Sequence, residues 1–489
     1  MSDDTRKANT ADVVTESARP VTFREVLSVR EYRALYGSLL VNWIGDYLSK
    51  AAVTLLVYQQ SESVVLSAAA FAVSFLPWVI GGPLLSALAE RYPYRRVLIS
   101  ADLFRILPTT LLLVPHMPIP LMVVLVFLAS LGMPPTQAAR SALLPHLVGR
   151  ERLPTAIAIN STTAQAAQVL GYLAGATIAT AISPRLALAV DVVSFALSAA
   201  FIAYGVRPRP AATTRAQRTH LLSESAEGFR LVLGTRVLRA IAVMVCLMTA
   251  FAIVPEALAA AWAAEATHDA ATRGLDQGLI MAAGPVGFII GGLLTTRLAT
   301  PALRDRLIRP FALASTLLLV PALAGPPPTM VALLVGLSGI AQGGLSPTLN
   351  GKFVLMIPHG YRARAYGVIQ TGMQLCQFLG IIVTGLLADR FWLPLVVGLW
   401  SVGGTAVMVV LSIDWPSTRA FDAAIDAAAA TMPPADQPPA AGTVPAPASP
   451  VESYTPTHAA RTPGETTAAA KPAYNPAHAA TTSITPERS

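Results

Sequence analysis

The chain has 489 residues, of which 54% are hydrophobic and only 13% are charged, and its formal net charge is +8. Soluble domains average about 25% charged residues, so this composition excludes an ordinary soluble protein. The basic residues are spread over many short segments instead of one face. That pattern excludes nucleic acid as a partner and favours anionic lipid headgroups.

Twelve apolar stretches are long enough to cross a bilayer, because about 20 apolar residues in a helix span its hydrocarbon core. The stretches lack the regular alternation of strands. We therefore expect an all-α, polytopic membrane protein built as two six-helix pseudo-repeats. The predicted spans are residues 34–57, 64–89, 97–114, 119–142, 156–182, 186–204, 240–264, 279–296, 307–324, 330–349, 365–387 and 393–413.

Basic residues gather in alternate gaps between the spans. The N-terminal segment and the gaps after even-numbered spans hold nearly all of them, whereas the odd-numbered gaps hold only Arg185, Arg273 and Arg390. Loops rich in arginine and lysine stay in the cytoplasm. We therefore expect a plasma or inner membrane protein with both termini in the cytoplasm. Residues 1–30 are polar and contain no apolar core, so no cleavable signal peptide is expected.

The longest internal gap divides the chain into two halves. The predicted parts are a cytoplasmic segment (1–33), an N-terminal six-helix bundle (34–205), a cytoplasmic central loop (206–239), a C-terminal six-helix bundle (240–415) and a cytoplasmic tail (416–489). The tail is rich in alanine, proline and threonine, and we expect it to be disordered. Within it, residues 421–430 have the pattern of one short surface helix.

Polar residues in spans five and eleven repeat at a constant offset of 209 residues. Such a repeat predicts a duplicated six-helix unit with a substrate site between the halves. Chance is the alternative, because glutamine and glycine are common. The paired positions are Ser161, Gln165, Gln168 and Gly171 in span five, and Gln370, Gln374, Gln377 and Gly380 in span eleven.

The gap after span two carries a motif of small, acidic and basic residues. Its members are Ser86, Glu90, Arg91, Pro93, Arg95 and Arg96. The motif resembles the loop between helices two and three of the major facilitator superfamily, which reads roughly G-x-x-x-D-R-x-G-R-R. Ser86 stands at the first glycine, Glu90 at the aspartate and Pro93 at the second glycine.

Further segments are similar to the branch of this family that includes enterobactin exporters. They are the runs at 42–46 (Asn-Trp-Ile-Gly-Asp), 95–105, 143–145 (Leu-Leu-Pro), Asn160 and 191–195 (Asp-Val-Val-Ser-Phe). The resemblance covers about residues 30–415. Span five reads Gly171-Tyr-Leu-Ala-Gly175 and lacks the proline that drug-antiporter branches often carry there.

The resemblance implies a cytoplasmic latch made by Ser86, Glu90, Arg91, Arg95 and Arg96. The acid would contact the N-terminal end of span eleven only when the cytoplasmic side is closed. The alternative is that these charges merely fix the topology. The resemblance also places spans one, four, seven and ten around a central cavity. The substrate-cavity candidates are Asn42, Lys50, Gln137, Gln165, Gln168, Gln342, Ser346, Gln374 and Gln377, together with the aromatic residues Trp43 and Trp262.

Two acids within the spans are candidates for proton coupling. Glu256 follows Pro255, which loosens a helix, and has no cation within one turn. A carboxyl group without a cation in a low-dielectric site is suited to carry a proton. Asp46 is the second candidate, but Lys50 lies four residues later and would form a structural pair with it. We expect Asp102 and Arg105 to be structural as well.

These observations predict a secondary active transporter that works by alternating access. We expect proton-coupled efflux of a small amphipathic or apolar organic compound, such as a drug, siderophore or secondary metabolite. The alternatives are an importer of the same fold, or a non-transporting membrane sensor or scaffold. No phosphate-binding loop, metal cluster or catalytic constellation is visible. The expected partners are the substrate, protons and the lipid bilayer, with no cofactor or metal and with a monomeric chain.

Overall fold

The computed structural model describes residues 21–81, 91–209, 221–267, 269–357 and 361–430. The chain divides into two units, Met1–Gln437 and Pro438–Ser489, and everything described lies in the first. Every described element is a helix. Ser86 and Glu90 of the predicted latch lie outside the described residues, as does the predicted tail beyond residue 430.

The N-terminal half contains the helices before residue 206. They are α2 (Phe23–Leu27), α3 (Arg30–Ser61), α4 (Val64–Ala72), the 3₁₀ turn η1 (Val73–Phe75), α6 (Tyr94–Leu111), α7 (Ile119–Ser130), α8 (Met133–Ala181) and α9 (Pro184–Gly205). Helix α8 is two helices in sequence, because Gly149 has φ +76° and ψ 170° and interrupts it. A positive φ of this kind favours glycine.

The C-terminal half follows the central loop, part of which forms α10 (Leu221–Gly234). The other elements are α11 (Arg236–Ala252), α12 (Val254–Ala257), α13 (Ala259–Ala266), α14 (Ala270–Leu298), α15 (Pro301–Leu317), η3 (Val320–Ala324), α16 (Pro328–Leu355), α17 (Arg362–Ala388), α18 (Leu393–Ile413) and α19 (Thr418–Ala430).

The described helices follow the twelve predicted spans in order, which confirms the all-α polytopic fold. Nine helical segments of the described chain are long and apolar enough to cross a membrane. The three spans outside that set are α3, α6 and the second part of α8. These helices carry many polar side chains, among them Asp46, Lys50, Asp102 and Arg105. These three spans therefore hold several of the interior polar groups described below.

The repeat between spans five and eleven has a counterpart in the packing. A Cβ atom added at Gly171 of α8 would lie 2.8 Å from the carbonyl oxygen of Ile44 in α3. A Cβ atom added at Gly380 of α17 would lie 2.8 Å from the carbonyl oxygen of Ala250 in α11. In each half, then, a glycine of the fifth helix lets its backbone pack closely on the first helix of that half, as duplicated units require.

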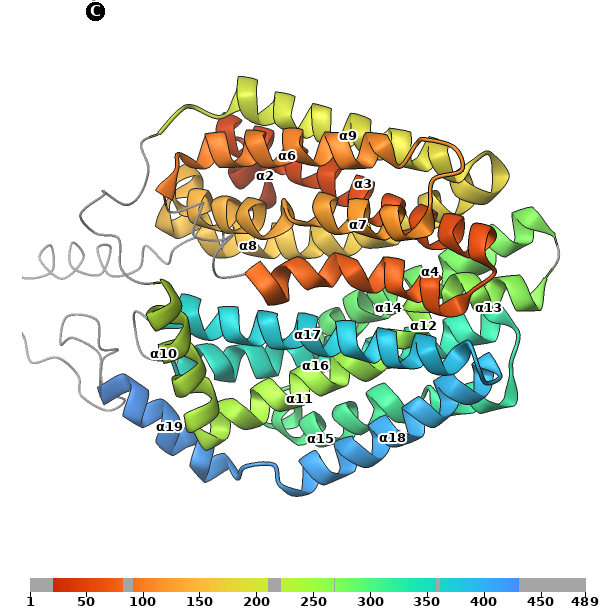
Figure 1. Ribbon diagram of the computed structural model, residues 1–489. Coiled ribbons are helices and arrows are strands. Elements are labelled where there is room, and N and C mark those ends of the chain that lie inside the picture. The colour runs from red at the N-terminus through yellow and green to blue at the C-terminus, as the bar shows by residue number, and fades with distance from the viewer. Residues whose placement is uncertain (1–20, 82–90, 210–220, 268, 358–360, 431–489) are drawn as a thin grey trace, which may run out of the picture. The chain divides into compact units, whose positions relative to one another are not determined.

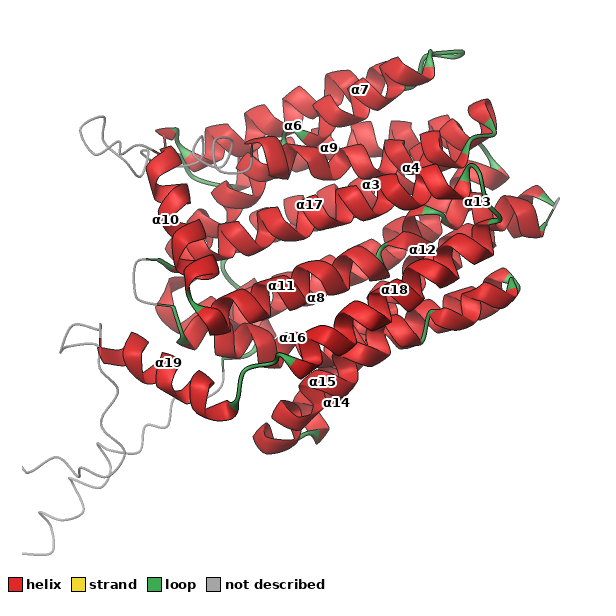
Figure 2. Cartoon of the chain, turned by 60° about the horizontal axis from the view of Figure 1, so that its bottom comes forward, coloured by secondary structure: helices red, strands yellow, loops and turns green. Residues whose placement is uncertain are grey.

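Helices α10 and α19 lie at one end of the bundle in both views, and α13 lies at the other (Figures 1 and 2). We call these the terminal end and the distal end. At the terminal end, Arg209 donates a hydrogen bond to Glu31 at 2.7 Å, and Arg364 donates one to Glu227 of α10 at 2.5 Å. The helix predicted at 421–430 is α19, and its Phe421 is buried in the core of the C-terminal half.

The two halves meet toward the distal end. Gln277 of α14 donates a hydrogen bond to the carbonyl oxygen of Ala51 in α3 at 3.0 Å. Ser63, before α4, donates one to Asp389, after α17, at 3.0 Å. One apolar core joins residues of both halves there, including Phe71 of the N-terminal half. These contacts close the distal side of the space between the halves.

Candidate functional site

A cavity of about 710 Å³ lies between the halves. Its wall is made by α3, the segment around η1, α6, α8, α12 and α17. Seven of the nine predicted cavity residues line it: Asn42, Lys50, Gln137, Gln165, Gln168, Gln374 and Gln377. Spans five and eleven thus contribute to the wall together with spans one, four and seven.

The other two predicted residues are placed differently. Gln342 of α16 lines a smaller pocket of about 200 Å³, which shares Gln165, Gln168 and Glu256 with the main cavity. Ser346 lines neither cavity and accepts a hydrogen bond from Asn350 at 3.1 Å. The two side chains lie on the same face of α16, with Ser346 about one helical turn further along the helix than Gln342.

Aromatic side chains make up much of the remaining wall. They are Trp43, Tyr47, Phe75, Trp78, Tyr172 and Tyr366. Only Trp43 among them was predicted from the sequence, because aromatic residues also occur on lipid-facing surfaces. The expectation for Trp262 was wrong. This residue is buried in the distal core, and its indole nitrogen donates to the carbonyl oxygen of Pro326 at 3.4 Å.

Glu256 lies where the two halves meet beside the cavity. Its span is interrupted on both sides, since α11 ends at Ala252, α12 covers only Val254–Ala257 and α13 begins at Ala259. The carboxylate is buried and accepts a hydrogen bond from the hydroxyl of Tyr172 in α8. The Tyr172 ring packs edge-on against Tyr47 of α3, with ring centres 5.1 Å apart. An acid of one half is therefore held by an aromatic pair of the other.

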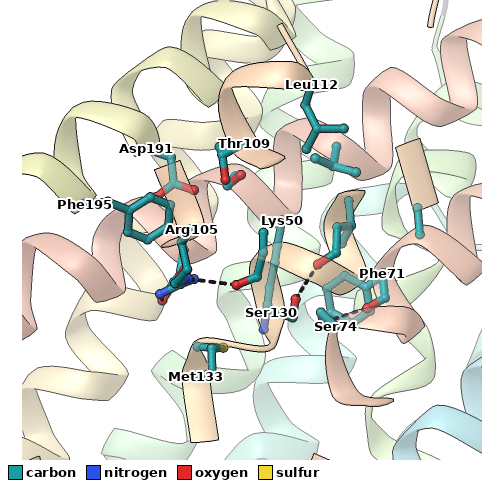
Figure 3. A pocket seen from close by; sticks show the side chains of 16 residues that line it. Lys50, Phe71, Ser74, Arg105, Thr109, Leu112, Ser130, Met133, Asp191 and Phe195 are labelled. Carbon is teal, nitrogen blue, oxygen red and sulfur yellow. Dashed lines mark hydrogen bonds and ion pairs between the residues drawn. The ribbon is translucent and has the colours of Figure 1, made fainter. Parts of the chain in front are cut away.

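Asp46 pairs with Arg105 of α6, not with Lys50 as the spacing along α3 predicted. Arg105 also donates to Asn42 Oδ1 at 3.2 Å and to the carbonyl oxygen of Ala129 at 3.0 Å. Its guanidinium group lies beside the Phe195 ring (Figure 3), and the guanidinium carbon is 4.1 Å from the ring centre. Arg105 is therefore fully occupied by protein groups, because a planar guanidinium can stack and donate several hydrogen bonds at once.

Two further buried acids stand behind the cavity wall. Asp102 accepts hydrogen bonds from Asn42 at 2.9 Å and from Ser198 at 2.5 Å. Asp191 accepts one from Ser194 at 3.0 Å. The bonds of Asp102 to Asn42 and Ser198 join α3, α6 and α9 inside the N-terminal half.

The basic members of the predicted latch are described, although its small and acidic members are not. Arg91 is exposed, and Arg95 donates a hydrogen bond to the carbonyl oxygen of Ala203 in α9 at 2.6 Å. Arg96 lines an apolar groove beside Tyr92. Since Glu90 and Ser86 lie outside the described residues, the latch stays a prediction.

Twelve spans in two related halves around a polar cavity define a multi-pass membrane transporter, not an enzyme. The sequence profile of the Major Facilitator Superfamily matches residues 35–309, which is more than half of the chain. The chain therefore belongs to the Major Facilitator Superfamily. No curated protein sequence matches it.

Solved structures with the same fold include several transporters. A D-xylose-proton symporter aligns with a TM-score of 0.62 at 13% identity, covering 81% of this chain and 99% of that chain. The nucleoside transporter NupG aligns with a TM-score of 0.57 at 14% identity, covering 80% and 99%. A peptide transporter, POT, in complex with sulfate aligns with a TM-score of 0.59 at 14% identity, covering 83% and 99%. At these identities the similarity shows a shared fold.

Proposed function

We propose that this protein is a proton-coupled transporter of the plasma or inner membrane that exports a small amphipathic organic compound by alternating access. The observation that carries the proposal is the cavity between the halves, with Glu256 at their junction. The wall combines amide side chains with aromatic rings, which suits a compound that has both polar and apolar parts. The export direction rests on the segments that resemble exporters.

The contacts between the halves suggest how the cavity changes access. With both termini in the cytoplasm, as the arginine pattern predicts, the distal end faces outward. The bonds from Gln277 to Ala51 and from Ser63 to Asp389 then belong to a conformer closed to the outside. Opening toward the outside requires these bonds to break, and the predicted latch at Glu90 would form on the cytoplasmic side instead.

Glu256 is the group to which we assign proton coupling, in preference to Asp46. Asp46 forms an ion pair with a buried arginine of its own half, so its carboxylate is already engaged by a cation. Glu256 contacts a neutral hydroxyl across the junction between the halves. An ionised carboxylate accepts that hydrogen bond more strongly than a protonated one does. Proton binding at Glu256 would thus weaken a contact that favours the conformer closed to the outside.

The test begins with a competitive export screen in cells that lack their own pumps, followed by assays in everted vesicles with an imposed pH gradient. Glu256→Gln should abolish substrate-dependent proton movement while it spares substrate binding. Glu265→Gln is the matched control, because Glu265 is exposed at the end of the same span, and it should behave as wild type. Unchanged coupling in Glu256→Gln would remove Glu256 from the mechanism. Uptake in place of extrusion would reverse the proposed direction.

The latch has its own test. Glu90→Ala should shift the protein toward the cytoplasm-open conformer, because it removes the contact that only the cytoplasm-closed conformer makes. A cysteine reporter in the cavity would then react faster with a reagent added from the cytoplasmic side. Unaltered accessibility of that reporter counts against the latch.

A further inference from the structure

Lys50 differs from the other cations of the cavity wall in what surrounds its charged group. Its ammonium nitrogen lies 5.3 Å from the centre of the Tyr47 ring, 5.2 Å from that of Phe75 and 6.0 Å from that of Phe71. Aromatic faces stabilise a cation without neutralising its charge. Figure 3 shows the side chain between Arg105 and Phe71.

No acid of the described chain forms an ion pair with Lys50. Three buried acids line a pocket together with Lys50, and each of them binds another group. Asp46 binds Arg105, Asp191 accepts a hydrogen bond from Ser194, and Glu256 accepts one from Tyr172. Lys50 therefore lines the cavity without an ion-pair partner among the described residues.

The rest of the wall has the same sign. Among the described charged residues that line the cavity, Lys50, Arg105 and Arg140 are cations and Glu256 is the single acid, and Asp46 already balances the charge of Arg105. Arg140 is buried and donates a hydrogen bond to Ser38 at 3.4 Å, while its Nε atom has no hydrogen-bond partner among the described residues. The acids Asp102 and Asp191 stand behind the wall. The cavity wall that a bound compound contacts is therefore positively charged, although the interior of the N-terminal half contains acids.

We infer that the transported compound carries an anionic group, such as a carboxylate, which binds Lys50 while an apolar or aromatic part packs on the ring of Tyr47 and its neighbours. The amides of Gln165, Gln168 and Gln374 then contact its neutral polar groups. An anion at Lys50 gains a charge-assisted bond in a site of low dielectric, which a neutral compound of the same shape does not. This inference rests on the proposed transport through the cavity, but not on its direction or its coupling ion.

The sign of the cavity potential can be measured without knowing the substrate. Cys246 and Cys376 are replaced by serine and Gln374→Cys is introduced in the full chain in nanodiscs. Its reaction rates with anionic sulfonatoethyl methanethiosulfonate and cationic trimethylammonioethyl methanethiosulfonate are compared with those of a free thiol. We divide the rate with the anionic reagent by the rate with the cationic reagent and normalise this ratio to that of the free thiol. We expect the normalised ratio to exceed one in the parent protein and to fall about tenfold in Lys50→Met. Lys50→Arg should retain the ratio.

Two controls separate this result from misfolding and from a general loss of charge. Lys352→Met removes a lysine that pairs with Asp305 outside the cavity, and it should leave the ratio unchanged. If Lys50→Met does not fold, Arg140→Gln must lower the ratio in its place. A ratio that favours the cationic reagent in the parent protein, or that is unaffected by loss of Lys50, overturns the inference.

Ligand preference supplies the second measurement. Naphthaleneacetate, naphthaleneacetamide and naphthylethylamine share a ring system and differ in charge, and each is tested for slowing the labelling of Gln374→Cys. We expect the carboxylate to protect at a concentration about tenfold below the other two, and Lys50→Met to abolish the difference. Equal protection by all three, or protection by none, contradicts an anionic substrate. Loss of gradient coupling in Glu256→Gln is measured in a separate assay. A failure of the coupling proposal therefore does not change the interpretation of the ligand-protection result.

Discussion

Breaking the buried pair of Asp46 and Arg105 should strongly destabilise the N-terminal half. Asp46→Asn leaves the guanidinium of Arg105, which is only 4% exposed, without its counter-charge. Removing one member of a buried ion pair typically costs about 3–5 kcal/mol, because the remaining charge is desolvated and unbalanced. Arg105 keeps its bonds to Asn42 and Ala129. We therefore expect a loss near the lower limit, about 3 kcal/mol in the free energy of unfolding.

A double-mutant cycle isolates the pair from the other contacts of Arg105. Arg105→Met alone leaves the carboxylate of Asp46 buried without a cation, so it should also cost about 3 kcal/mol or more. The double variant removes both charges and avoids an uncompensated one. Its loss should be smaller than the sum of the single losses by about 2 kcal/mol.

The free energies are measured by reversible unfolding in mixed micelles, with helicity followed as sodium dodecyl sulfate is titrated. Asp414→Asn is the control, because Asp414 and Arg236 form an ion pair whose side chains are 78% and 70% exposed. An exposed pair contributes at most about 1 kcal/mol. Two results would refute an ion pair that stabilises the N-terminal half. One is a loss of unfolding free energy in Asp46→Asn that is no larger than the loss in Asp414→Asn. The other is strict additivity of the single losses in the double-mutant cycle.

Two further predictions concern the terminal end and the packing of the C-terminal half. Glu31→Gln should speed amide hydrogen exchange at Arg207, whose backbone N–H donates to Glu31 at 3.4 Å, because it removes the carboxylate that binds Arg207 and Arg209. Burial raises the pKa of Glu31, but the bonds and charges of Arg209 and Arg207 lower it below the usual value of 4.5. This contact is therefore fully formed above that value and is lost as the pH falls through the lowered pKa, so the ratio of exchange rates between the variant and the wild type should be constant between about pH 6 and pH 8. Gly291→Ala should destabilise the protein by about 1–3 kcal/mol, because its Cβ would lie 2.7 Å from a carbonyl carbon of α16. A Cβ atom added at Gly292 would lie 3.5 Å from its nearest neighbour, so Gly292→Ala should be neutral or slightly stabilising. Equal losses of stability at both glycines would contradict close packing as the cause.

The spans could be predicted from the sequence because hydropathy along the chain is a local property. The span predicted at 393–413 agrees with α18 at both ends. The cavity glutamines were also predictable, since Gln165 and Gln168 have counterparts at a fixed offset in span eleven. A repeated polar face in two apolar helices has few explanations other than an interior cavity.

The pairing of charges could not be predicted in the same way. Helical spacing nominated Lys50 as the partner of Asp46. The actual partner, Arg105, comes from α6, which packs on α8 and α9, and these two helices in turn pack on α3. The rings around Lys50 come from two separate elements, α3 and the α4–η1 segment. The position of Trp262 depended on where its span breaks, which a continuous helical wheel cannot show. Each of these failures concerns a contact between helices, whereas the successes concern single helices.

The two halves are stabilised in different ways, although they are related by duplication. In the N-terminal half, ionic and hydrogen bonds of Asp46, Asp102 and Arg105 join α3, α6 and α9. Such bonds are costly to rearrange in a low-dielectric interior, so this half should move as one body. In the C-terminal half, the span that carries Glu256 is interrupted at Ile253 and Leu258. A broken helix beside a cavity can change its local geometry at low cost. The acid that contacts the N-terminal half therefore lies on an interrupted segment of the C-terminal half. The proposed coupling uses this arrangement, because proton binding at Glu256 would then alter the contact between the two halves.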